Sequence, residues 1–208
     1  MQYGKRNAER GFSFLELVTV VGIIMILAGF AVMSTTSTTY NSRANAAMDS
    51  LINQLRQSRE MAISMRRNVL VQITAPNVIQ ITVETLPGEA PAKAIPPVYL
   101  NDNVAGGSQF FVFPGLPDTP MNFGNSQAIN FVPASGGASG LSTMFTTSGT
   151  LVGSTLTSGF ATVGNSNPVN ASIFIGIPGH QNTARAITIL GATGRVRSYY
   201  WTGTTWQE

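Results

Sequence analysis

The sequence predicts an α+β protein in which one long amino-terminal helix packs against a mostly antiparallel β-sheet head. Three patterns along the 208 residues support this fold. An apolar run covers residues 12–33, and residues 34–67 follow with apolar side chains at every third or fourth position, as in an amphipathic helix. From residue 68 to residue 208, short alternating segments are separated by turns rich in Gly and Pro, as in antiparallel strands.

The charge pattern argues against a protein that binds nucleic acid through its bulk charge. Charged residues make up 10% of the chain, compared with roughly 25% in typical soluble domains. The net charge is +3, but residues 1–11 hold three basic residues and one acidic residue, which leaves +1 for residues 12–208. The absence of cysteine excludes disulfides, thiolate metal sites and cysteine catalysis.

The apolar run is long enough to be a transmembrane helix. It contains 22 residues, of which only Glu16 is charged. At about 1.5 Å per residue it spans roughly 33 Å, enough for a hydrocarbon core of about 30 Å. Three basic residues precede the run, whereas the first charge after it is Arg43. The positive-inside rule therefore places residues 1–11 in the cytoplasm and the head on the other side of the membrane.

Glu16 distinguishes this segment from a cleaved secretory signal and from a plain anchor. A secretory signal has an apolar region of about 7–15 residues that ends at a small-residue cleavage site, and the run here is longer. A carboxylate within the membrane costs at least about 2.5–3.5 kcal/mol and usually serves a function. Neither a secretory signal nor a simple anchor gains from such a residue.

The residues around Glu16 carry a family resemblance. The segment GFSFLELV at residues 11–18 resembles the type III signal of type IV pilins and of type II secretion pseudopilins. The resemblance implies that prepilin peptidase cleaves between Gly11 and Phe12 and methylates the new amino terminus at Phe12. Glu16 then becomes the fifth mature residue, at the position of the family's glutamate. In the family this carboxylate neutralises the amino-terminal amine of a neighbouring subunit during filament assembly.

The amphipathic stretch predicts that the helix continues well beyond the membrane. Its expected apolar stripe comprises Ala44, Ala47, Met48, Leu51, Ile52, Leu55, Ala62 and Met65. No proline occurs before residue 76, so nothing forces a break, although the Ser/Thr-rich residues 34–39 are weak helix formers. The arginines on the other faces, at positions 56, 59, 66 and 67, are interpreted as solvated, with pairing to acidic residues of neighbouring subunits as the alternative.

The head is predicted to be one mostly antiparallel sheet. Strands are expected at residues 69–73, 78–83, 109–113, 128–132, 171–177, 185–190 and 195–201. The first two are expected to form a hairpin around Ala75-Pro76-Asn77. Residues 133–168 contain only short apolar pieces. Residues 191–194, Gly-Ala-Thr-Gly, are expected to form the turn between the last two strands.

Three segments of this region resemble the GspH/FimT group of minor pilins and pseudopilins. They are RQSREMAISMRRNVLV at residues 56–71, FTTSGT at residues 145–150 and ARAITILGATGRVR at residues 184–197. Residues 86–143 match nothing in that group and are interpreted as insertions. The resemblance implies a pilin-like fold: a cleaved leader at residues 1–11, a transmembrane half of the helix at 12–33, an amphipathic half at 34–67 and a periplasmic head at 68–208.

The sequence offers no support for an enzyme. It has no nucleophile elbow, no phosphate-binding loop and no cluster of residues with metal-ligand spacing, so neither a metal nor a cofactor is expected. The single histidine, His180, is interpreted as a solvated residue of a turn.

Two arginines near the carboxyl-terminal end raise a second possibility. Arg195 and Arg197 flank Val196 in a predicted strand and should project to the same face. Some FimT-type minor pilins with Gly-Arg-x-Arg at this position bind DNA during natural transformation, and residues 194–197 match that motif. Arg185 is expected nearby as a further phosphate contact, and Tyr199 as a surface for base stacking.

The prediction from the sequence is therefore a structural subunit: a minor pseudopilin of a type II secretion system or a minor pilin of a type IV pilus. It is expected to cross the bacterial inner membrane once, with prepilin peptidase, membrane lipid and other pilins or pseudopilins as partners. The alternative is a minor pilin that binds DNA for uptake.

Overall fold

The computed structural model describes residues 13–84, 93–100, 106–132, 142–157 and 160–208. The chain divides into two compact units, residues 1–39 and residues 40–208. The second unit is an α+β fold with antiparallel strand pairing, as the sequence predicted.

The helix α1, Phe14–Met65, contains 52 residues and runs through the Ser/Thr-rich segment without interruption. It ends where Arg66 adopts a left-handed backbone conformation, with φ of 53°. The amide of Arg67 then donates to the carbonyl of Ala62 at 3.2 Å, the hydrogen bond of a Schellman cap. Among the residues that the structure describes, no helix is both long enough and apolar enough to cross a membrane.

Within the second unit, α1 buries the predicted apolar stripe except at Met48, which is partly buried, and at Met65. Ala44, Leu51 and Leu55 are almost completely inaccessible to solvent. Met65, expected in the stripe, is 53% exposed, because it is the last residue of the helix and the chain turns away there. Ser58 is fully buried instead, and its hydroxyl donates to the carbonyl of Gln54 at 2.7 Å, which satisfies it within the helix.

The head contains two sheets rather than the single sheet that the sequence predicted. The larger sheet has the order β3-β2-β1-β7-β8-β9, with β4 paired to β2. Its strands are β1 Val69–Thr74, β2 Val78–Val83, β3 Lys93–Ala94, β4 Val98–Tyr99, β7 Ser142–Phe145, β8 Leu151–Thr157 and β9 Phe160–Pro168. The predicted hairpin of β1 and β2 is confirmed, with Val69 opposite Val83.

The second sheet has the order β13-β12-β11-β10-β5, with β6 also paired to β10. Its strands are β5 Gln109–Phe110, β6 Ile129–Val132, β10 Asn170–Ile177, β11 His180–Leu190, β12 Arg195–Trp201 and β13 Trp206–Gln207. The three long strands and the turn at residues 191–194 are confirmed, although β11 begins five residues before the predicted start at residue 185.

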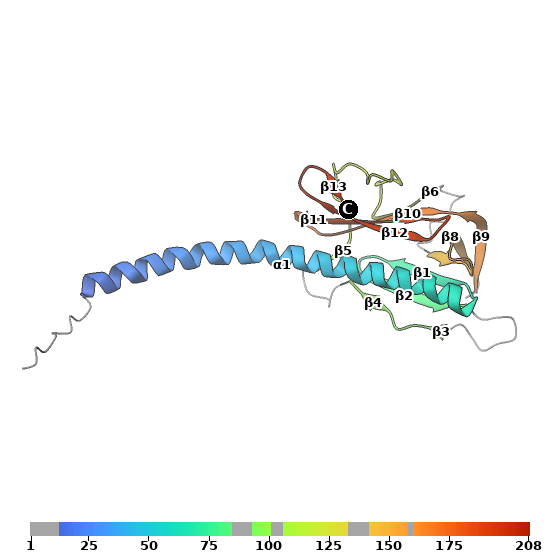
Figure 1. Cartoon of the computed structure of the whole chain (residues 1–208), viewed down its shortest axis with the longest axis horizontal. Coiled ribbons are helices and arrows are strands. Elements are labelled where there is room, and N and C mark those ends of the chain that lie inside the picture. Colours follow the sequence, from blue (N-terminus) through green and yellow to red (C-terminus); the bar gives the residue numbers. More distant parts are fainter. Residues whose placement is uncertain (1–12, 85–92, 101–105, 133–141, 158–159) are drawn as a thin grey trace, which may run out of the picture. The chain divides into compact units, whose positions relative to one another are not determined.

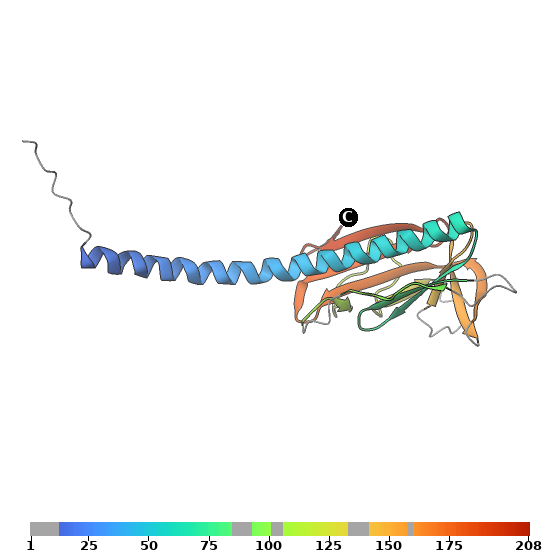
Figure 2. The same cartoon turned by 90° about the horizontal axis from the view of Figure 1, so that it is seen from below.

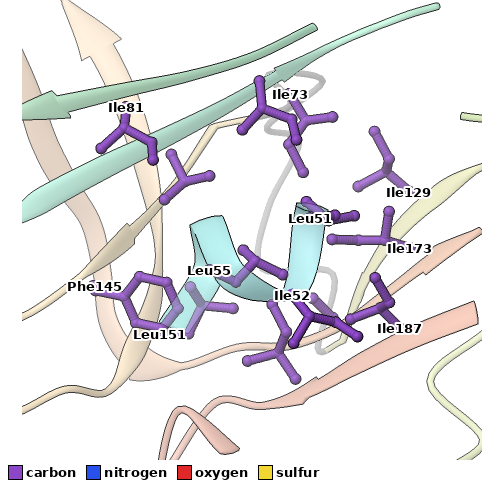
Figure 3. Close-up of a cluster of buried hydrophobic side chains, with 14 of the residues drawn as sticks. Leu51, Ile52, Leu55, Ile73, Ile81, Ile129, Phe145, Leu151, Ile173 and Ile187 are labelled. Carbon is purple, nitrogen blue, oxygen red and sulfur yellow. The ribbon is translucent and has the colours of Figure 1, made fainter. Parts of the chain in front are cut away.

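The main core lies where α1 meets both sheets. Figures 1 and 2 show the cyan part of α1, in the second unit, running alongside the strands. In Figure 3, Leu51, Ile52 and Leu55 of the helix lie among side chains of both sheets. The larger sheet contributes Ile73, Ile81, Phe145 and Leu151, and the smaller sheet contributes Ile129, Ile173 and Ile187. Burial of such side chains is the dominant favourable term in folding.

A second apolar cluster lies on the smaller sheet. It contains Phe113, Leu116, Phe174, Ala184, Ala186, Tyr199, Trp201 and Trp206. The indole of Trp206 donates to the carbonyl of Pro117 at 2.8 Å, so residues from the segment interpreted as insertions cover this sheet. Seven of the eight residues of β10 are buried, because apolar side chains cover both of its faces.

Candidate functional site

The residues of the predicted assembly signal lie at the start of α1. Gly11 and Phe12 are outside the described residues. Glu16 lies in the first helical turn and is exposed, and its backbone carbonyl accepts a hydrogen bond from the Thr19 hydroxyl at 2.9 Å. The Glu16 carboxylate has no hydrogen-bond or ion-pair partner among the residues that the structure describes.

The surroundings of Glu16 on α1 are apolar and exposed. Phe14 and Leu15 are 84% and 72% exposed, and Phe30 is 70% exposed. The other exposed large apolar side chains of this segment are Leu17, Val18, Val20, Val21, Ile23, Ile24, Met25, Ile26 and Leu27. A continuous apolar surface of this kind normally marks a site of contact with a membrane or another protein.

Arg195 and Arg197 lie at the start of β12, as predicted. Alternation along the strand places both on the same side. Arg195 is exposed, and its guanidinium has no partner among the described residues. A guanidinium nitrogen of Arg197 lies 3.5 Å from the Glu208 carboxylate. A hydrogen bond with the Tyr199 side chain, together with the charge of Glu208, raises the pKa of Arg197.

Arg59 of α1 lies beside these two residues, and two glycines make room for it. Its Nε atom donates to the carbonyls of Gly149, at 3.3 Å, and Thr193, at 3.1 Å. Gly149 and Gly194 have φ values of +79° and +64°, and a Cβ atom on either would come within 3.1 Å or less of the Arg59 Nε. The glycines of the FTTSGT and GRVR segments therefore lie close to Arg59, and a Cβ atom would also clash with the Ile63 side chain at Gly149 and with the Gly149 carbonyl at Gly194.

Together these residues line a groove of about 460 Å³. It is lined by Arg56, Arg59, Glu60, Gly194, Arg195, Val196, Arg197 and Glu208; we call it the arginine groove. Four arginines and two glutamates give it a formal charge of +2. The sequence interpretation treated Arg56 and Arg59 as solvated, which holds for the exposed Arg56, but it did not place either of them in a groove with Arg195 and Arg197. The spacing of three residues between Arg56 and Arg59, which puts them on one face of the helix, was the available signal.

Arg185 does not belong to this groove, and its predicted role at a phosphate contact is wrong. In the register of β11 and β12, Arg185 lies opposite Tyr200, whereas Arg195 lies opposite Leu190 at the other end of the hairpin. Arg185 is only 5% exposed and donates to the Asn45 Oδ1 at 2.8 Å and to the carbonyls of Asn182 and Ala184. Burial lowers its pKa. Arg185 joins the head to the helix instead of facing solvent.

Two other interpretations of single residues also need correction. Tyr199 is 3% exposed within the second apolar cluster, so its ring is not a surface for base stacking. His180 is exposed, as expected, but it is the first residue of β11 rather than a residue of the turn, and its ring stacks on Tyr40 with centroids 4.0 Å apart. Within the described ranges, no group of His, Cys, Asp or Glu side chains has an arrangement that could hold a metal ion.

No protein-family model, no curated protein and no solved structure matches this chain.

Proposed function

We propose that this protein is a minor subunit of a pilin-like filament, either the pseudopilus of a type II secretion system or a type IV pilus. Prepilin peptidase removes residues 1–11 and methylates Phe12, and the head then remains in the periplasm. The proposal rests on the resemblance of residues 11–18 to a prepilin signal. The observation that carries it is the unpaired Glu16 carboxylate on an exposed apolar helical surface.

In this proposal the apolar part of α1 contacts the membrane first and other subunits later. It is the anchor of the single subunit in the inner membrane, and it packs against other helices once the subunit enters a filament. The anchoring role is assigned to the whole segment of residues 12–33, which extends beyond the described side chains at both ends. An unpaired charge in an apolar medium is costly, so the amine of a neighbouring Phe12 at the same depth lowers the free energy of docking.

Replacement of Glu16 by alanine tests this function. The Glu16→Ala chain should still insert and lose residues 1–11, because neither step uses the carboxylate, but its amount in sheared filaments should fall at least about tenfold. Loss of one buried ion pair, worth several kcal/mol, is sufficient for an effect of that size. Mass spectrometry of the membrane fraction measures cleavage and methylation, and immunoblots of membrane and filament fractions measure assembly.

A matched variant separates charge from shape. Glu16→Asp keeps the charge and should retain part of the assembly, whereas Glu16→Gln keeps the shape and should behave like Glu16→Ala. Normal incorporation of both uncharged variants would contradict the proposal. The identity of the other proteins in the filament fraction, secretion pseudopilins or type IV pilins, decides between the two machineries.

A second candidate function is DNA binding by the head during natural transformation. It is favoured by the position of Arg195 and Arg197, which lie together at a groove with a local charge of +2 in a chain whose residues 12–208 carry only +1. The planar guanidinium of an arginine can donate two parallel hydrogen bonds to phosphate oxygens. The affinity of such a site for DNA depends strongly on salt concentration.

The double variant Arg195→Gln/Arg197→Gln tests the second function. In a gel-shift assay at low salt, the wild-type chain should retard single-stranded DNA, and the double variant should bind at least about tenfold more weakly, because two phosphate contacts are lost. Absence of any shift by the wild-type chain at low salt would exclude DNA binding.

A further inference from the structure

The four arginines that line the arginine groove come from two parts of the chain that are far apart in sequence. Arg56 and Arg59 come from α1, and Arg195 and Arg197 come from β12. The spacing of Arg56 and Arg59 places them on the same side of the helix. The two strand arginines are therefore only half of the positive charge that faces this groove.

Arg59 is held in place before any ligand arrives. Its Nε atom bonds to the carbonyls of Gly149 and Thr193, which fixes the plane of the guanidinium. Within the described part of the chain, its remaining nitrogens have no partner, and the side chain lines the groove. A cation fixed in this way loses little conformational entropy when it binds an anion, so it favours binding more than a free surface arginine does.

Glu208 lies in the same groove and competes for one of these cations. Its carboxylate is 3.5 Å from Arg197, and the side chains of the pair are 32% and 54% exposed. Exposed pairs of this kind are weak. An incoming phosphate can therefore replace the Glu208 carboxylate, but it must break that contact and tolerate a negative charge beside it.

We propose that the arginine groove is the binding site for the phosphodiester backbone of DNA, that Arg56 and Arg59 of α1 are binding residues in it, and that Glu208 weakens binding by occupying Arg197. The proposal deepens the second candidate function and rests on it. A backbone that follows the groove contacts the helix and the strand at once, and it neutralises four arginines that the two glutamates offset only in part.

The test uses the full chain in detergent and a short fluorescein-labelled single-stranded oligonucleotide, with fluorescence anisotropy recorded over a series of salt concentrations. Arg56→Gln is compared with Arg43→Gln, which removes the same charge from an exposed position of the same helix outside the groove. Arg56→Gln should weaken binding about threefold to fivefold, the size expected for one exposed charge contact. It should also reduce the slope of log K against log salt by about 0.7, and Arg43→Gln should change neither quantity.

Glu208→Gln should change the affinity for the oligonucleotide in the direction opposite to Arg56→Gln. It should tighten binding about twofold to fivefold, because the competing carboxylate is gone while the shape is kept. Unchanged melting temperatures of the three variants show that folding is intact. Equal effects of Arg56→Gln and Arg43→Gln, or no gain in Glu208→Gln, would overturn the inference. If Arg195→Gln/Arg197→Gln still lost binding in that case, DNA binding by the head would stand without the roles of Arg56, Arg59 and Glu208. Absence of binding by the wild-type chain would contradict both this inference and the second candidate function.

Discussion

Replacement of Gly194 by alanine is expected to lower the free energy of unfolding by about 3 kcal/mol. Gly194 has φ of +64°, where an L-residue costs about 1–2 kcal/mol. A Cβ atom there would also clash with the carbonyl oxygen of Gly149 and lie 2.7 Å from the Arg59 Nε. Backbone cannot move aside as a flexible side chain does, so the clash adds about 1–3 kcal/mol. Chemical denaturation of the full chain in detergent measures the loss.

Gly179→Ala is the matched control for this prediction. Gly179 lies in the turn before β11, has φ of +85° and has nothing within 4 Å of a Cβ position. Its replacement should lower the free energy of unfolding by only about 1–2 kcal/mol, the cost of the backbone conformation alone. The difference between the two variants measures how closely the β11–β12 turn approaches Arg59 and Gly149. Equal losses would show that this approach contributes nothing to stability.

Local patterns were sufficient to predict the helix, the first hairpin and the three long strands near the carboxyl-terminal end. The helix was expected over residues 12–67 and is observed as Phe14–Met65. These elements depend on neighbours a few positions apart, which a sequence displays directly. The second sheet had a local signal as well: β10 reads Asn-Ala-Ser-Ile-Phe-Ile-Gly-Ile, and a nearly continuous apolar run indicates a strand that is covered on both faces.

The residues that cover the smaller sheet at the second apolar cluster could not be predicted from local patterns. They include Phe113, Leu116 and Pro117, which lie in irregular backbone between β5 and β6. Irregular segments have no periodicity, so their apolar residues do not show which surface they cover. Residues 86–143 were interpreted as insertions because they match nothing in the GspH/FimT group, although part of that segment completes the second apolar cluster.

Only the two strand arginines of the arginine groove could be predicted from the sequence. Alternation along one strand placed Arg195 and Arg197 together, because that relation is local. The contacts of Arg59 join it to residues 90 and 134 positions away. No spacing within a single sequence reveals contacts over such separations. Exposure is also the usual state of an arginine, which favoured the solvated interpretation of Arg59 and the surface interpretation of Arg185.

Replacement of the buried Arg185 by alanine is expected to lower the free energy of unfolding by about 3 kcal/mol. The change removes the donor to the Asn45 Oδ1 and to the carbonyls of Asn182 and Ala184, and it leaves a cavity. The hydrogen bond to the Ala184 carbonyl is buried, and a buried acceptor left without a donor costs about 1–3 kcal/mol. Truncation of a large buried side chain adds to this. Thermal and chemical denaturation of the full chain measure the effect.

Arg185→Met separates packing from charge and tests the corrected role of this residue. Methionine retains most of the side-chain length and removes a cation whose burial is itself costly, so the loss should be smaller than in Arg185→Ala. Arg185 lies at the opposite end of the β11–β12 hairpin from the arginine groove. Folded Arg185→Met protein should therefore bind the oligonucleotide as tightly as the wild-type chain, whereas Arg195→Gln/Arg197→Gln should not. Equal weakening by both variants would return Arg185 to the DNA-binding surface, and would mean that its bonds to Asn45 and the two carbonyls open when DNA binds.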